Sequence, residues 1–175
     1  MQLKSHRYFM LVICGFLFLA DRYLKWQALY EWGNDYLLNR FFGWHPFLNP
    51  GVAFSIPVPS WLIIALTLPI LCLLGYLLLN EFFHVARSTQ HVAGELDYKI
   101  LSAQNGYVLR VMCYGLIFFG ALSNLIDRVL YGYTIDYFLI LTGVINLADV
   151  MIALGFVIYF VYSKNFVKPA CADRI

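Results

Sequence analysis

Charge is scarce in this sequence. Asp, Glu, Lys and Arg account for 13% of its 175 residues, while 62% are hydrophobic. Water-soluble domains have about a quarter charged residues, so this composition excludes an ordinary soluble fold. The mean hydropathy of +0.71 instead indicates a membrane protein. The net charge of +2 is also too small for a nucleic-acid-binding protein, because such proteins present strongly basic surfaces.

Cysteine is scarce as well. The four cysteines are scattered along the chain, and three of them lie inside apolar segments: Cys14, Cys72 and Cys113. No two have the spacing of metal ligands, and their distribution is unlike a disulfide framework. The sequence therefore predicts neither a cysteine metal site nor disulfide bonds.

Long apolar runs, by contrast, are plentiful. Four segments predict membrane-spanning helices, at about residues 8–24, 61–79, 107–126 and 144–162. The first has the basic start of a signal peptide but no small-residue cleavage site, so we interpret it as a retained helix. The length suits one membrane-embedded domain, residues 1–175. The sequence predicts an all-α membrane protein with four transmembrane helices.

The connection between the first two spans, residues 26–60, is rich in aromatic residues. All four tryptophans fall in or beside it. Trp and Tyr concentrate at the membrane–water interface, so we expect this loop to lie along the lipid headgroups. Leu37-Leu38 and Phe41-Phe42 fit a short interfacial amphipathic element. Around Gly51, small residues alternate with larger ones, which predicts a strand or an extended loop.

Positive charge is distributed unevenly across the predicted membrane. Eight of the 12 Lys and Arg residues fall on the side that holds both termini, and four fall on the other side. The positive-inside rule makes the first side cytoplasmic. Polar residues from distant parts of the chain then collect at the outer side: Asp21, Asn49, Asp127, Asp136 and, shallowly within the last span, Asp149.

Two of the predicted helices carry residues suited to close contact. Asp21 and Lys25 are four residues apart at the end of the first span, so they share a helical face and we expect an ion pair. In the third span, Gly115, Gly120 and Ala121 are small enough to let a neighbouring helix approach closely.

Carboxylates are rare in the apolar segments, yet three of them lie in or beside residues 120–150: Asp127, Asp136 and Asp149. A charge at bilayer depth costs about 2.5–3.5 kcal/mol, so such residues are functional candidates. Two carboxylates in one site do not both ionise easily. One keeps its proton while the other acts as a base, and together they can activate water against an amide.

Other chemistries are less well supported. The nearby hydroxyl side chains lack a histidine partner, and a metal site needs three or four ligands, so we expect no metal and no cofactor. Composition alone does not decide which two aspartates pair. Asp127 precedes Arg128, a local cation that favours a structural role for this aspartate, whereas Asp136 and Asp149 have no adjacent cation.

Five ordered motifs carry a resemblance to a known family. They are Asp21…Lys25, Asn49-x-Gly-x-Ala-Phe54, Gly120-x-x-x-Asn-x-x-Asp-Arg128, Gly132-x-x-x-Asp136 and Asn146-x-Ala-Asp149. The chain resembles lipoprotein signal peptidase (signal peptidase II) from the first span to the fourth. Members of this family are intramembrane aspartyl endopeptidases of the bacterial inner membrane. They cut prolipoproteins on the N-terminal side of the diacylglyceryl-modified cysteine.

The resemblance implies roles for the matching residues. The catalytic pair would be Asp136 and Asp149. The residues that would bind substrate or hold this pair are Asn49, Gly51, Asn124, Arg128 and Asn146. The residues that would support the architecture are Asp21, Lys25, Asp127 and Phe54. The family fold also implies a small periplasmic β-cradle and an interfacial helix between helices 1 and 2, within residues 26–60.

The resemblance further implies prolipoprotein substrates, surrounding membrane lipids, inhibition by globomycin-like cyclic peptides and a monomeric state. Both termini would be cytoplasmic, with the active site near the periplasmic face. The sequence departs from the family's usual pattern at several positions. Ser123 replaces a glycine, Tyr137 and Ile145 replace phenylalanines, and Pro50 lies within the Asn-x-Gly element. None of these departures removes a catalytic group.

Two other classes of protein are compatible with the residues themselves. A proton-coupled transporter would also place carboxylates in the membrane. It would carry acids into the cytoplasmic halves of its spans, where this sequence has none. A structural subunit or an inactive homologue would leave the outer polar residues without a shared geometry.

Overall fold

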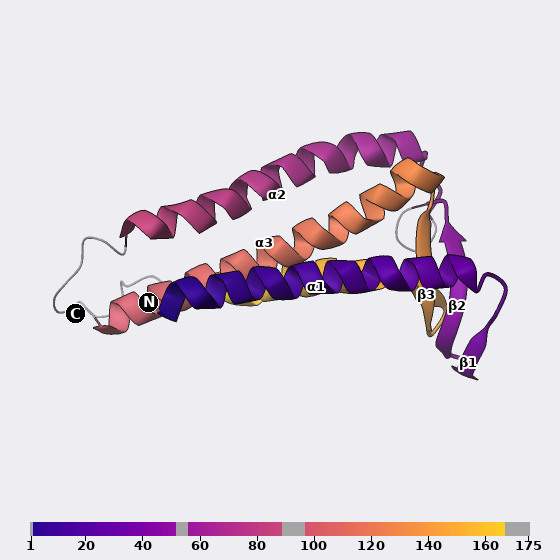
Figure 1. The fold of residues 1–175 in the computed structure, drawn as a ribbon, viewed down its shortest axis with the longest axis horizontal. Coiled ribbons are helices and arrows are strands. Elements are labelled where there is room, and N and C mark those ends of the chain that lie inside the picture. Colours follow the sequence, from indigo (N-terminus) through magenta and orange to yellow (C-terminus); the bar gives the residue numbers. More distant parts are fainter. Residues whose placement is uncertain (1, 52–55, 89–96, 167–175) are drawn as a thin grey trace, which may run out of the picture.

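A computed structural model describes residues 2–51, 56–88 and 97–166. The long helices of the described residues run along one axis, and a small sheet closes one end of the molecule (Figure 1). In chain order the elements are α1 (Gln2–Tyr30), β1 (Tyr36–Asn39), β2 (Phe42–Asn49), α2 (Ser60–Ser88), α3 (Asp97–Tyr131), β3 (Thr134–Ile140), β4 (Gly143–Ile145) and α4 (Leu147–Phe166).

Helix α3 lies at the centre of the bundle and packs against the other three helices. Its glycines permit the closest approaches. A Cβ atom added to Gly120 would lie 2.6 Å from the carbonyl oxygen of Ala148, and one added to Gly115 would lie 3.1 Å from the Cys14 sulfur. The predicted close contacts at these two glycines are therefore confirmed. Gly120 brings the start of α4 against α3, and Gly115 brings α1 against it.

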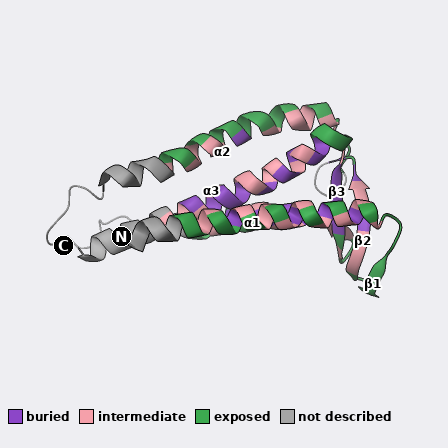
Figure 2. Cartoon of the chain, viewed as in Figure 1, coloured by how far each residue is buried: buried purple, intermediate pink, exposed green. Residues whose placement is uncertain are grey.

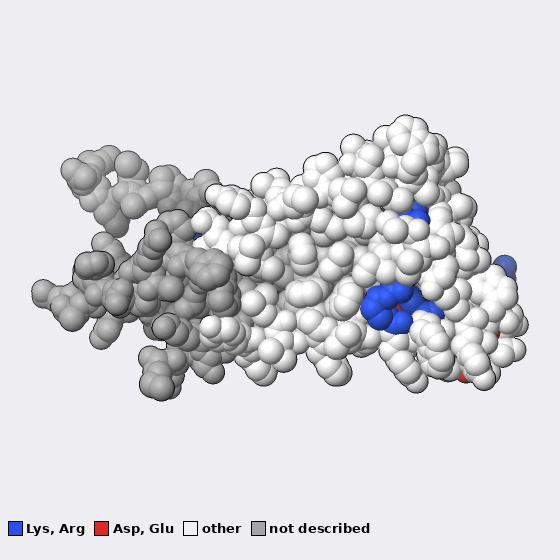
Figure 3. All heavy atoms as spheres, turned by 45° about the horizontal axis from the view of Figure 1, so that its top comes forward, with Lys and Arg blue, Asp and Glu red and all other residues white. Residues whose placement is uncertain are grey.

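Among the residues that the structure describes, two helical segments are long and apolar enough to cross a membrane, Ser60–Glu81 and Val108–Tyr131, and Leu147–Val161 is a shorter apolar stretch. Over residues 60–81, where its side chains are described, α2 alternates between exposed and half-buried residues, and Leu71 is buried (Figure 2). The face in Figure 3 is nearly free of charged side chains along the helices, and its blue atoms gather toward the sheet end. Such an apolar surface suits lipid rather than water. Four membrane crossings remain a prediction.

The sheet is antiparallel, with the order β1-β2-β3-β4. Strands β2 and β3 form its centre, where Phe47 lies opposite Asp136 and Asn49 lies opposite Thr134. Half of this sheet comes from the connection between α3 and α4. The placement of the whole β-cradle within residues 26–60 is therefore wrong.

The interfacial helix predicted between the first two long helices is also wrong for the described part of that connection. The apolar pairs that suggested it lie in the β1–β2 hairpin. The side chain of Asn39 accepts hydrogen bonds from the backbone N–H groups of Phe41 and Phe42, at 2.8 and 2.9 Å. This local bonding closes a tight turn, which lets the flanking aromatic residues pair as strands.

Candidate active site

Asp136 lies in the centre of the sheet, as the third residue of β3, and is buried. Both of its carboxylate oxygens accept amide hydrogen bonds. Asn49 of β2 donates from Nδ2 to Oδ2 at 3.0 Å, and Asn146 donates from Nδ2 to Oδ1 at 2.6 Å. The orientation of this carboxylate is therefore fixed by two side chains that are far apart in the sequence.

Asp149 lies in the first turn of α4, where Asn146 caps the helix. Asn146 Oδ1 accepts from the Asp149 backbone N–H at 2.9 Å, and Asp149 Oδ2 accepts from the Asn146 N–H at 3.4 Å. This reciprocal pair is a capping box. The other oxygen of Asp149 accepts from Asn124 Nδ2 of α3 at 2.8 Å.

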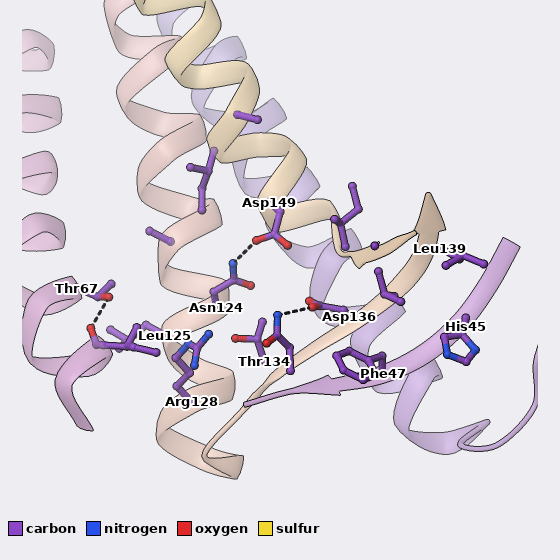
Figure 4. Close-up of a pocket in the computed structure, with 18 of the residues that line it drawn as sticks. His45, Phe47, Thr67, Asn124, Leu125, Arg128, Thr134, Asp136, Leu139 and Asp149 are labelled. Atoms are coloured by element: carbon purple, nitrogen blue, oxygen red, sulfur yellow. Dashed lines mark hydrogen bonds between the residues drawn. The ribbon is translucent and has the colours of Figure 1, made fainter. Parts of the chain in front are cut away.

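The two aspartates line the same cavity, which has a volume of about 750 Å³. Figure 4 shows Asp136 on its strand and Asp149 on its helix, with both carboxylates directed into the space beside Asn124. Asn146 contacts both acids from behind. The cavity also reaches α2 at Ile63 and Thr67. The structure thus brings together the two aspartates that the sequence analysis favoured.

The electrostatic environment of Asp136 favours its protonated form. Burial raises the pKa of Asp136 to about 7, and the nearby carboxylate of Asp149 adds to this effect. The hydrogen bonds from Asn49 and Asn146 oppose it, because they stabilise the ionised carboxylate. At neutral pH this group can hold or release a proton, as an acid–base pair requires.

Behind the two aspartates lies a second polar cluster, buried except for the partly exposed Arg22, which we call the supporting network. Its members are Asp21, Arg22, Lys25, Ser123 and Asp127. Lys25 Nζ lies 3.1 Å from Asp21 Oδ2 and 2.7 Å from Asp127 Oδ2, so the predicted Asp21–Lys25 ion pair is confirmed. Lys25 also donates to Asn124 Oδ1 at 2.8 Å, which connects this network to Asp149.

The cation partners of Asp127 differ from the sequence interpretation, which paired Asp127 with the adjacent Arg128. Asp127 is bound by Arg22 and Lys25, both from α1. Adjacent residues point about 100° apart around a helix, so Arg128 faces elsewhere. Arg128 Nη2 donates to the carbonyl oxygen of Gly51, whose N–H donates to Asn49 Oδ1 at 3.0 Å.

Arg128 also lines the cavity, and its Nη1 has no hydrogen-bond partner among the described residues. The same is true of Thr134 Oγ1. Phe54, the remaining residue predicted to give structural support, lies outside the described residues. Among the residues that the structure covers, no three His, Cys, Asp or Glu side chains are grouped so that they could hold a metal ion.

Sequence reasoning missed three members of the site. Arg22 follows Asp21 directly, so its position beside a carboxylate was the available signal. Tyr137 and Ser123 were noted only as departures from a family pattern, yet both donate hydrogen bonds to Asp21, at 2.9 and 2.6 Å. Their hydroxyl groups replace residues without a polar side chain, and this difference was the signal that a buried hydrogen-bond acceptor lay nearby.

Known proteins resemble this chain along nearly its whole length. Residues 13–165 match the family described as signal peptidase (SPase) II. The chain is 29% identical to a lipoprotein signal peptidase of Serratia marcescens over 174 residues, which cover 95% of this chain and 91% of that protein. It is 31% identical to one of Dichelobacter nodosus over 150 residues, covering 82% and 86%.

Two solved structures share the fold. One is a bacterial membrane enzyme determined by the in meso method at 2.3 Å resolution, with a TM-score of 0.72 and 20% identity over 95% of this chain and 93% of that one. The other, determined at 1.9 Å, has a TM-score of 0.65 and 21% identity over 92% and 94%. With the family match covering most of its length, the chain belongs to the signal peptidase II family.

Proposed function

We propose that this chain is an aspartyl endopeptidase that removes the signal peptide from prolipoproteins, cutting on the N-terminal side of the diacylglyceryl-modified cysteine. The observation that carries the proposal is the joint position of Asp136 and Asp149. They line one cavity, and Asn146 bonds to both. Family membership supports the substrate class, because signal peptidase II enzymes act on prolipoproteins.

In the proposed reaction, the two carboxylates share one proton. Asp136 carries it, consistent with its raised pKa, and Asp149 acts as the base. Asp149 takes a proton from water while the water oxygen bonds to the scissile carbonyl carbon, and Asp136 gives its proton to the carbonyl oxygen. The tetrahedral adduct then collapses. Asp149 passes its proton to the amide nitrogen as the C–N bond breaks, and one hydroxyl proton of the adduct returns to Asp136. A new carboxyl group and a free amine result.

Other residues of the cavity would hold the substrate. Arg128 has one guanidinium nitrogen without a partner among the described residues, and it can donate to a backbone carbonyl of the bound peptide. The cavity wall toward α2 and α4 is apolar, with Ile63, Ile152 and Ala153 among its residues. An apolar wall next to a hydrolytic pair suits a substrate that carries acyl chains beside the cut bond.

The proposed location follows from the same arrangement. The sheet and both aspartates would lie at the periplasmic end of a four-helix bundle in the inner membrane, with both termini cytoplasmic. Water for the reaction would then enter from the periplasm, while the lipid-modified substrate would reach the cavity from the bilayer.

The test compares Asp136→Asn and Asp149→Asn with the parent enzyme on a lipidated prolipoprotein, in detergent or in vesicles. Each substitution preserves shape but removes the acid, so we expect a loss of at least about 10³-fold, because the two groups act as a unit. Mass spectrometry should show that the parent's product begins at the modified cysteine. Asp35→Asn is the matched control, since Asp35 is an exposed aspartate just before β1, paired with His45.

Two results would contradict the proposal. One is parental activity in either of the two aspartate variants. The other is equal cleavage of a precursor whose cysteine carries no diacylglyceryl group, because the apolar wall would then have no part in substrate choice.

A further inference from the structure

The hydroxyl group of Tyr137 lies between the two elements that carry the proposed catalytic pair. Tyr137 follows Asp136 in β3, so its side chain points to the opposite face of the strand, away from the cavity. It is fully buried. Its hydroxyl donates to Asp21 Oδ1 at 2.9 Å and accepts from the backbone N–H of Leu147 at 3.0 Å. Leu147 is the first residue of α4, two positions before Asp149.

The protonation state of this tyrosine suits that double role. Burial and the neighbouring Asp21 carboxylate raise the pKa of Tyr137 above its usual value. The hydroxyl therefore keeps its proton and remains a donor to Asp21. Its lone pairs stay free to accept from Leu147.

Asp21 completes the connection. The oxygen that accepts from Tyr137 also accepts from the backbone N–H of Ala148 at 3.1 Å. Its other oxygen is held by Lys25 at 3.1 Å and by Ser123 at 2.6 Å. The first N–H groups of a helix have no partner within the helix. In α4 they are bound by Tyr137, Asp21 and Asn146 in succession.

The Tyr137 ring has packing contacts of its own besides the hydrogen bonds of its hydroxyl. The ring packs against Trp44, with centroids 5.1 Å apart, and against Phe138, with centroids 4.7 Å apart. Ile135 and Ala28 belong to the same buried cluster. A phenylalanine would keep this packing and lose only the two hydrogen bonds, so the hydroxyl can be tested separately from the ring.

We propose that Tyr137, acting through Asp21 and the start of α4, is a positioning residue that sets the separation of Asp136 and Asp149. The inference rests on the proposed function, because it assigns a task to Tyr137 within that reaction. Tyr137 joins the strand of one aspartate to the helix of the other, on the side away from substrate. Loss of its hydroxyl frees the first turn of α4 to shift relative to β3 while both acids remain present.

The experiment measures kcat and KM separately for Tyr137→Phe on the lipidated precursor. A misplacement of about 1 Å can cost about 10²-fold in rate, so we expect kcat to fall at least tenfold with KM within twofold of the parent. The pH at which activity is lost should also move, since the separation of the two acids sets how strongly each affects the other. Tyr131→Phe, at an exposed tyrosine at the end of α3, should leave both constants unchanged.

Ser123→Ala distinguishes positioning from general support. It also removes one hydrogen bond to Asp21, but Ser123 bonds to neither β3 nor α4 in the described contacts. We expect Ser123→Ala and Tyr137→Phe to lower the unfolding temperature comparably, with the large fall in kcat confined to Tyr137→Phe. Equal losses of kcat in the two variants, or parental kcat and pH profile in Tyr137→Phe, would overturn the inference.

Failure of the positioning role can be distinguished from failure of the proposed function. If Asp136→Asn and Asp149→Asn are inactive while Tyr137→Phe behaves as the parent, only the positioning role fails. If either aspartate variant keeps parental activity, the proposed function fails first, and with it the reaction in which Tyr137 would act.

Discussion

Asn146 donates a hydrogen bond from its side-chain amide to Asp136 over 2.6 Å. The carbonyl oxygen of the same amide accepts from the backbone N–H of Asp149. One side chain therefore caps α4 and orients the acid on β3, so stability and the proposed activity would depend on different halves of a single amide.

Substitutions at Asn146 should separate these two tasks. Asn146→Ala removes both bonds, and we expect a loss of about 1 kcal/mol in the free energy of unfolding from the missing cap together with a large fall in processing rate. Serine is a good helix cap but lacks the amide NH2 group that donates to Asp136. Asn146→Ser should therefore recover the stability without the rate, measured by unfolding in detergent and by precursor cleavage. Recovery of both would mean that Asp136 does not need this amide.

The rate should fall as the pH rises through about 7. In the proposed reaction Asp136 must hold its proton to act as the acid, and burial raises its pKa to about 7. The hydrogen bond from Asn49 favours the ionised form, so Asn49→Ala should raise this pKa further and move the loss of activity to higher pH. Rates measured from pH 5 to pH 9 test this, with Asp35→Asn as the control. A shift to lower pH in Asn49→Ala would contradict the assignment.

The stability of the folded chain should also depend on pH through the proton on Asp136. The ordinary pKa of an aspartate is 3.8, so between pH 3.8 and about 7 the folded chain binds a proton at Asp136 that the unfolded chain releases. The contribution of this group is fully present below that range and is lost as the pH rises through it. The unfolding temperature of the parent should decline over this interval more steeply than that of Asp136→Asn. Parallel curves would show that Asp136 does not titrate there.

Lys25 should be the most costly residue of the supporting network to lose. It is fully buried and forms ion pairs with both Asp21 and Asp127. Removing one partner of a buried pair costs about 3–5 kcal/mol, because a charge stays behind without compensation. We expect Lys25→Met to lose about that much in denaturant unfolding, and Lys25→Met with Asp21→Asn to regain part of it. Arg22→Met should cost less, since Arg22 is partly exposed and Asp127 would still be paired with Lys25.

Gly120→Ala should push the start of α4 away from α3. The added Cβ would lie 2.6 Å from the Ala148 carbonyl oxygen and 2.9 Å from Ile152 Cγ1, and a backbone atom cannot rotate aside. Overpacking of this kind costs about 1–3 kcal/mol, and the contact between Asn124 and Asp149 lies one turn further along. We expect lower stability and slower cleavage. Gly15→Ala is the control, because its Cβ would meet nothing within 4 Å.

The sequence was informative where a property is local. Apolar runs predicted the long helices, and the spacing of Asp21 and Lys25 predicted their ion pair. Residue spacing could not show that residues 134–145 complete a sheet with residues 36–49, because that pairing joins segments separated by two helices. The partner of Asp127 was misassigned for the same reason. Its nearest cation in sequence points away from it, and its actual partners lie about a hundred residues earlier.

The two Asn-x-x-Asp units illustrate this limit. In Asn146-x-x-Asp149 the spacing is that of a helix cap, which folds the asparagine back onto the aspartate. In Asn124-x-x-Asp127 the same spacing lies inside α3, and the two side chains serve different neighbours: Asn124 bonds to Asp149, and Asp127 bonds to α1. Identical spacing has two structural meanings, and only the position of the helix start distinguishes them.

The charges of the supporting network have a consequence for synthesis of the protein. Asp21, Arg22 and Lys25 emerge from the ribosome together and carry one surplus positive charge, which Asp127 neutralises only when α3 has been made. Until then, the end of α1 must stay in contact with water or headgroups. Asp149 follows later still, so the nascent chain holds only half of its proposed catalytic pair until its last helix is inserted. On this order of events, a partly made chain lacks the proposed activity until α4 is in place.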